Sequence, residues 1–170
     1  AAPVRPTVCP FADLSSWEVE VVISEAGIAR LKHSGTWSAP WTGAVVKKVL
    51  KPDLQAAYDR KKEEMAQRLG QACVNERFLF HGTSLSSAMA IAETNFSMSK
   101  VRSRGTYGRG FYFSRNAGVS EEYAHARRSN LDPGAMLLCR VLAGKPCHMT
   151  LRNEGYFLPE GFDSHIDGLR

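Results

Sequence analysis

Apolar residues follow two different periods in the first part of the chain. They alternate with polar residues from Trp17 to Ser24, which predicts a half-buried strand, and residues 45–50 predict another. From Pro52 the spacing becomes helical, and Gly70 stands where a helix would stop. We therefore predict a helix over residues 52–69 with a solvated, charged outer face. Its expected apolar face consists of Leu54, Tyr58, Met65 and Leu69.

The second part of the chain predicts short strands separated by turns, at residues 78–80, 110–113 and 136–142. Ser84 is a suitable cap for a short helix after the first of them. The apolar positions of that helix are Leu85, Ala88, Met89 and Ala92. A further helix is expected over about residues 116–128. Strand pairs with interspersed helices indicate a mixed α+β domain.

The length of 170 residues is typical of one domain. We expect residues 1–44 to form a lead-in with the first strands, and residues 45–170 to form the core. The chain begins without Met, which suggests a piece of a longer polypeptide. No stretch is long and apolar enough to span a membrane, and no signal segment is visible, so no membrane partner is expected.

Charge and cysteine content narrow the classes of partner. Lys and Arg outnumber Asp and Glu by 22 to 17, which suits either a polyanionic ligand or an ordinary solvated surface. The basic residues are scattered, so nucleic-acid binding is not indicated. The four cysteines have no Cys-x-x-Cys spacing, and Cys147 beside His148 is a weak metal signal. We expect free thiols, no metal and an intracellular location, nuclear or cytoplasmic.

Three short motifs carry candidate chemistry. The first is Phe80-His81-Gly82-Thr83. Glycine lets a ligand approach the backbone closely, and one residue's N–H and C=O match the two ends of a primary carboxamide. Histidine beside it can bond a ribose hydroxyl. The alternative is a packed histidine followed by a turn.

The second motif is a glycine-rich turn that leads into an aromatic strand, from Gly105 to Ser114. Phosphate-binding loops follow a strand and open a helix, whereas this turn precedes a strand, so neither a Rossmann loop nor a P-loop is favoured. Alternation places Tyr112 on the face opposite Phe111 and Phe113. Tyr112 is therefore a candidate to line a cleft while its neighbours pack; the alternative is a tight turn before a core strand.

The third motif is Ser120-Glu121-Glu122-Tyr123. A spacing of three places Ser120 and Tyr123 on the same side of a helical turn. A planar heterocycle can stack on the tyrosine while the serine bonds its polar edge. Either residue alone is more often a sign of ordinary packing or a helix cap.

Together these motifs have the order and approximate spacing of one known family. The chain resembles the poly(ADP-ribose) polymerases, and most closely the mono-ADP-ribosylating members without a helical regulatory domain. The resemblance extends from about Val45, through Asn75 to Thr83 and Arg140 to Gly144, to Ser164. It implies an ADP-ribosyltransferase-like α+β fold of mainly antiparallel split sheets with flanking helices.

The resemblance also implies a role for each motif residue toward NAD, the ADP-ribose donor. His81 bonds the adenosine-side ribose, with Thr83 nearby, and the Gly82 backbone holds the nicotinamide carboxamide. Tyr112 and Tyr123 sandwich the nicotinamide ring, and Ser120 contacts its amide. His81 and Tyr112 are the expected catalytic residues, and the expected acceptor is a protein. A loop over residues 97–105 is expected to cover the donor with its basic residues Lys100, Arg102 and Arg104.

Two departures from the family pattern affect this expectation. Asn95 stands where many relatives have glycine, which is tolerable because asparagine also enters the left-handed backbone region. The family's third motif, a strand with the catalytic glutamate or its replacement, normally follows the segment that resembles residues 162–165. Glu154 and Glu160 precede that segment and do not match the motif. The alternative function is therefore an NAD- or ADP-ribose-binding regulatory module without transferase activity.

Overall fold

The structure is a computed structural model, and it describes residues 7–9, 18–20, 49–101, 105, 107–127, 131–149 and 158–167. Some predictions fall wholly or partly outside these residues. They concern most of the strand from Trp17 to Ser24, residues 45–48, Arg102, Arg104 and Glu154. Val49 and Leu50 are described and belong to no strand.

The described elements alternate between strands and helices, as the α+β prediction requires. In chain order they are β1 (Thr7–Cys9), β2 (Glu18–Glu20), α2 (Pro52–Leu69), η3 (Gln71–Cys73), β3 (Glu76–Ser84), α3 (Leu85–Thr94), η4 (Met98–Lys100), β4 (Phe111–Tyr112), α4 (Ala117–Arg127), β5 (Gly134–Leu142), β6 (Pro146–Met149) and β7 (Ser164–Asp167). No helix among the described residues is both long and apolar enough to cross a membrane.

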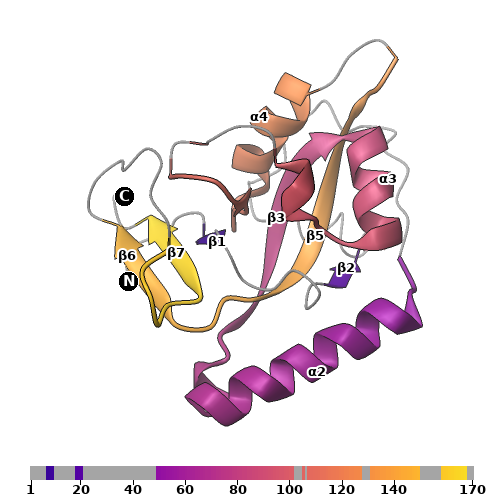
Figure 1. The fold of residues 1–170 in the computed structure, drawn as a ribbon. Helices are drawn as coiled ribbons and strands as arrows, with labels where there is room; N and C mark the ends of the chain where they lie inside the picture. Colours follow the sequence, from indigo (N-terminus) through magenta and orange to yellow (C-terminus); the bar gives the residue numbers. More distant parts are fainter. Residues whose placement is uncertain are drawn as a thin grey trace.

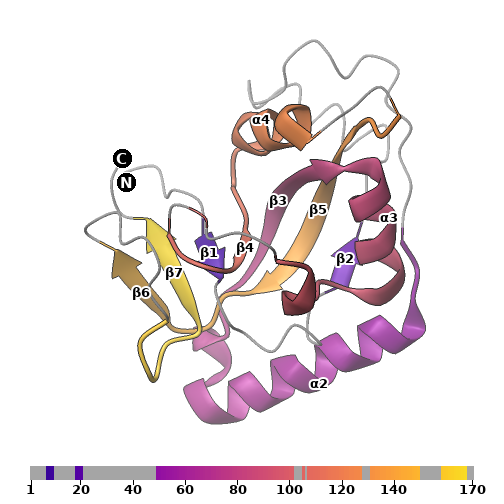
Figure 2. The same cartoon turned by 45° about the horizontal axis from the view of Figure 1, so that its top comes forward.

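The strands form two sheets, which confirms the predicted split-sheet architecture. One sheet has the order β4-β1-β7-β6 and the other β2-β5-β3. All pairs are antiparallel except β6 with β7. Figure 1 shows α2 crossing below the long β3–β5 pair and α4 at the opposite end, with α3 beside the strands. Figure 2 shows β1, β4, β6 and β7 gathered beside that pair.

The first of the predicted central strands is longer than its sequence suggested. β3 continues from Glu76 to Ser84, and all nine residues pair with β5, from Glu76 with Leu142 to Ser84 with Gly134. The alternative interpretation, in which a turn follows His81, is therefore wrong. Pairing with a distant strand keeps the polar His-Gly-Thr segment extended, although its local sequence favours a turn. β4 is shorter than predicted and has only two residues.

The α2 prediction is confirmed at both ends. The helix begins at Pro52, and Gly70 ends it with φ of 86°, a left-handed value that suits glycine. Tyr58 and Met65 are buried and pack with Val74 and Leu142. The charged face is mostly exposed, and Lys61 pairs with Glu64 within the helix at 2.8 Å.

The α3 prediction is correct in position but wrong in its buried face. Ser84 caps the helix by accepting a bond from the Ser87 N–H. Ala88 is buried, whereas Leu85 and Met89 are 42% and 61% exposed. The helix lies beside the sheet edge, so the residues that pack inward are Ala88 and Ile91 rather than the full apolar stripe.

A second residue, Asp132, also binds the start of α3. Its carboxylate accepts the Ser86 N–H at 2.9 Å and the Ser86 hydroxyl at 2.6 Å. These bonds from Ser86 lower the pKa of Asp132 below its usual range. The segment before β5 is thereby attached to the helix that follows β3.

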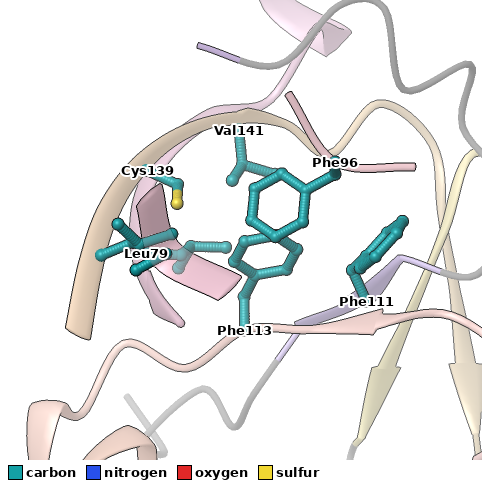
Figure 3. Packing of buried hydrophobic residues seen from close by; sticks show 8 residues of the cluster. Leu79, Phe96, Phe111, Phe113, Cys139 and Val141 are labelled. Carbon is teal, nitrogen blue, oxygen red and sulfur yellow. The ribbon is translucent and has the colours of Figure 1, made fainter. Parts of the chain in front are cut away.

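The main core lies on the face of the sheet that α3 covers. Phe96, Phe111 and Phe113 pack side by side against Leu79, Cys139 and Val141 of β3 and β5 (Figure 3). The ring centres of Phe96 lie 4.8 Å from Phe111 and 5.3 Å from Phe113, in tilted or edge-on arrangements. The predicted burial of Phe111 and Phe113 is confirmed.

A polar network connects α2 to the sheet. The Glu76 carboxylate accepts the Tyr58 hydroxyl and the Lys62 ammonium, the latter at 2.7 Å. The Arg140 guanidinium lies 4.3 Å above the Tyr58 ring and donates to Gln55 at 2.9 Å. Burial alone would raise the pKa of Glu76, but Lys62, Tyr58 and Arg140 together lower it by more. The pKa is therefore below its ordinary value, and the carboxylate stays charged.

We predict that Arg140→Met lowers the free energy of unfolding by about 1–2 kcal/mol, because it removes the ring contact and one of the charges facing Glu76. Denaturant titration measures this change. Lys61→Met is the matched control, since its pair with the exposed Glu64 is worth about 0.5 kcal/mol or less. Equal losses in the two variants would contradict the central role of Arg140.

We predict that Asp132 makes stability depend on pH in the acid range. Because its folded pKa is lowered, its contribution is present above the ordinary value of 3.8 and is lost as pH falls through the folded pKa. Thermal unfolding of the wild type and Asp132→Asn should differ near pH 7, and the two curves should converge in strong acid. A difference that is independent of pH would refute this linkage.

Candidate functional site

The fold brings the three candidate motifs together. β3 carries His81, Gly82 and Thr83; β4 carries Tyr112; and α4 carries Ser120 and Tyr123. Ser114, just after β4, exchanges two backbone bonds with Phe80 of β3, at 2.7 and 2.9 Å. α4 packs against the opposite face of β3 from the main core. The predicted residues therefore surround one short stretch of the β3 edge.

Gly82 presents its backbone at this edge. Along a strand, the N–H and C=O of residues two apart point to the same side. Since the N–H and C=O of Phe80 bond Ser114, those of Gly82 point to that same outer edge, away from β5. Among the described residues the backbone pairing on this edge ends at Phe80. Gly82 thus offers one donor and one acceptor side by side.

The absence of a side chain at Gly82 is required by α4. A Cβ on this residue would lie 1.7 Å from the Ser120 carbonyl oxygen and 2.9 Å from the Ala124 nitrogen. A Cβ on Gly134 of β5 would likewise lie 2.6 Å from the Ala124 carbonyl oxygen. The two glycines allow the helix backbone to lie directly on the strands. This close approach brings Ser120 to the Gly82 edge.

Ser120 is 3% exposed and points toward β3. Its hydroxyl donates to the Phe80 carbonyl at 3.0 Å. The hydroxyl oxygen keeps its acceptor capacity. A ligand amide that is bonded by the Gly82 backbone can therefore donate to Ser120 as well.

His81 is held in one tautomer. Its Nδ1 lies 2.9 Å from the Tyr112 carbonyl oxygen. A carbonyl only accepts, so Nδ1 carries the hydrogen and, in the neutral ring, Nε2 is the acceptor. The ring packs edge-on against Phe96 at 5.1 Å and in a tilted arrangement against Phe113 at 5.5 Å. The histidine is thus packed, as in the structural alternative, and is also fixed in the form that accepts a hydroxyl hydrogen.

The two candidate tyrosines differ in their surroundings. Burial raises the pKa of Tyr112, the bond from the Tyr107 N–H lowers it, and the nearby Tyr123 hydroxyl raises it. Tyr112 is half-buried, whereas Tyr123 is 52% exposed. One ring is fixed from β4 and the other projects from α4.

The structure also describes other predicted residues and two that the sequence did not predict. Thr83 is half-buried on β3, and Lys100 is exposed at the end of η4. Sequence reasoning missed Arg109, which donates to the Met98 carbonyl at 3.0 Å, and Phe96, which packs on His81. The Gly-Thr-Tyr-Gly-Arg-Gly sequence from Gly105 to Gly110 indicates a turn but gives no sign of the Arg109 contact. Asn95 has a φ of 72°, so its predicted left-handed backbone is confirmed.

A polar cavity of about 240 Å³ lies elsewhere, at the beginning of β3. It is lined by residues of α2, η3 and β3, among them Lys62, Asn75 and Arg77. No aromatic side chain lines it, and its strand residues lie at the far end of β3 from Gly82. It therefore does not offer the stacking surfaces that a nicotinamide ring requires, and the candidate site is the one at Gly82.

Comparison with known proteins assigns the chain to a family. Residues 31–165 match the family described as the poly(ADP-ribose) polymerase catalytic domain. The human protein mono-ADP-ribosyltransferase PARP12 is 39% identical over 93 residues, which cover 54% of this chain and 13% of that protein. Human protein mono-ADP-ribosyltransferase PARP14 is 32% identical over 104 residues, covering 61% of this chain and 6% of that protein.

A probable poly(ADP-ribose) polymerase of Dictyostelium discoideum is 27% identical over 138 residues, which cover 77% of this chain and 41% of that protein. The chain thus spans a minor part of the length of each of these relatives. The family match, in contrast, covers most of the chain and includes β3, β4 and α4 with all six candidate residues. The chain therefore belongs to the poly(ADP-ribose) polymerase catalytic domain family.

Proposed function

We propose that this chain binds NAD and acts in protein mono-ADP-ribosylation, with release of nicotinamide. The observation that carries the proposal is the Gly82 edge, where a backbone N–H and C=O lie beside Ser120 and between the segments that bear Tyr112 and Tyr123. Nicotinamide is a planar ring with a primary carboxamide, and it matches this combination. The names of the human relatives, which are mono-ADP-ribosyltransferases, support the single-unit form of the reaction.

In this proposal the carboxamide oxygen accepts from the Gly82 N–H, and the amide nitrogen donates to the Gly82 carbonyl and to Ser120. The tyrosine faces hold the ring, and His81 Nε2 accepts a ribose hydroxyl on the adenosine side. Lys100 lies on the segment that is proposed to cover the donor, where its charge suits the pyrophosphate. These contacts fix the leaving group before reaction, which lowers the entropic part of the barrier.

The reaction breaks the bond between ribose C1′ and the nicotinamide nitrogen, and both bonding electrons leave with nicotinamide. The ribose carbon then bonds a nucleophilic atom of the acceptor side chain, which releases its proton. NAD and the acceptor thus yield ADP-ribosyl acceptor, nicotinamide and a proton. Nicotinamide is a good leaving group because its ring takes up the bonding electrons and becomes neutral when the bond breaks.

A module that binds NAD or ADP-ribose without transfer is the second candidate. Glu160, the described glutamate nearest to the family's third-motif segment, is exposed in a turn and lies on none of the elements of the Gly82 site. No element of the proposed site thus brings Glu160 to the ribose. Binding with no covalent transfer would select this alternative.

We also propose an intracellular location, nuclear or cytoplasmic. The free thiols of Cys73, Cys139 and Cys147 motivate this proposal. Fractionation of cells that express the full-length protein tests it, and recovery from the secreted fraction would refute it.

We predict that the purified chain binds labelled NAD and that Tyr123→Ala and His81→Ala each weaken binding at least tenfold, because they remove a stacking face and a ribose acceptor. Equilibrium binding and covalent label are measured in the same samples. His148→Ala, an exposed histidine, is the control and should bind like the wild type. Wild-type binding by both site variants, or no binding by a folded wild type, would refute the NAD site.

We predict that Gly82→Ala abolishes nicotinamide binding and lowers stability by about 2–4 kcal/mol, since its methyl group overlaps the Ser120 backbone. Ser120→Ala should weaken nicotinamide binding about tenfold with a stability loss of only about 1 kcal/mol. Calorimetric titration with nicotinamide and denaturant unfolding measure the two effects. Unchanged affinity in Gly82→Ala would show that the ligand does not use this edge.

A further inference from the structure

The Tyr112 hydroxyl makes two bonds to the turn that precedes its own strand. It donates to the Gly108 carbonyl, and it accepts the Tyr107 N–H at 3.2 Å. Gly105 also contacts the side chain, because a Cβ on Gly105 would lie 2.3 Å from the hydroxyl oxygen and 2.5 Å from Cζ. Three residues of the turn therefore meet one tyrosine side chain.

The turn itself is closed by a pair of backbone bonds. Gly105 and Gly108 each donate to the other's carbonyl at 3.0 Å, and Gly108 has a φ of 95°. We call this segment the 105–108 turn. β4, which follows it, has only two residues, so its ladder gives the turn little support of its own. The hydroxyl of Tyr112 adds side-chain bonds that fasten the turn to the strand.

A side chain that follows the 105–108 turn also bonds η4. Arg109, just after the turn, donates to the Met98 carbonyl at 3.0 Å. Residues 97–105 form the segment proposed above to cover the donor. The turn thus stands between that segment and β4, and Tyr112 contacts it from the side of the candidate site.

We propose that the Tyr112 hydroxyl is a positioning group that holds the 105–108 turn against the ring on which nicotinamide stacks. The proposal rests on the proposed NAD site and adds a second role for Tyr112. Its ring gives the ligand a flat face, and its hydroxyl fixes the adjoining turn. Ring position and turn position are thereby coupled, so ligand stacking on the ring also stabilises the closed turn.

The substitution Tyr112→Phe separates the two roles because it keeps the ring and removes both bonds to the turn. Amide hydrogen exchange of the unliganded chain measures the effect at Tyr107 and Gly108. We expect exchange there to accelerate about tenfold in the variant, as the Tyr107 N–H loses its acceptor. Tyr123→Phe is the matched control: it removes the hydroxyl of the other tyrosine and should leave exchange in the turn unchanged.

Gly105→Ala is a second, independent variant. It keeps the hydroxyl but displaces it, since the added methyl group overlaps the Tyr112 side chain. We expect the same acceleration at Tyr107 and Gly108. Wild-type exchange in both Tyr112→Phe and Gly105→Ala would overturn the proposal, whatever their affinity for ligand.

Adding nicotinamide to the same samples tests the coupling. In the wild type, saturating nicotinamide should slow exchange at Tyr107 further. In Tyr112→Phe, nicotinamide should still bind through the retained ring, but without slowing that amide. A tyrosine hydroxyl that is merely structural would leave the ligand response intact. If nicotinamide binds neither protein, the proposed NAD site fails, while the exchange of the unliganded chain still decides whether the hydroxyl holds the turn.

Discussion

The contact between the α4 backbone and β3 at Gly82 determines the geometry of the site. Because no side chain separates them, the helix lies close enough for Ser120 to bond the Phe80 carbonyl at 3.0 Å. Tyr123 follows Ser120 by three residues, which is the spacing of side chains on the same side of a helix. A larger residue at position 82 would move the helix and separate these groups. The close approach is therefore a requirement of the site as well as of packing.

Sequence patterns predicted the elements that depend on local signals. Pro52 and Gly70 define the ends of α2, and Ser84 caps α3, because capping and backbone preferences act within a few residues. The length of β3 could not be predicted in this way, since its pairing with β5 joins residues that are 50 to 66 positions apart. The exposed Met89 was wrongly predicted to be buried for a similar reason: periodicity gives a helix face but not what lies opposite it.

The candidate site was likewise predicted in part: its residues could be predicted from the sequence, whereas several of their contacts could not. Its residues were found through their combined order in the sequence, and the family match confirms the resemblance on which their roles were based. The roles themselves remain proposals. The Arg140–Tyr58–Glu76 network and the bonds of the Tyr112 hydroxyl were not predicted, because each depends on side-chain directions that follow from tertiary packing. Local sequence specifies which groups are present, and the pairing of distant strands decides which of them meet.

The exposed backbone of Gly82 has a consequence for ligand selectivity. A carboxamide presents the same donor and acceptor as a peptide group, so β3 would receive it as it receives the backbone of a neighbouring strand. An acid of the same shape, such as nicotinic acid, would instead bring a charged oxygen against the Gly82 carbonyl, with no hydrogen to share between them. The strand edge would thus distinguish an amide from its acid by main-chain complementarity, a form of discrimination that changes of side chain cannot easily remove.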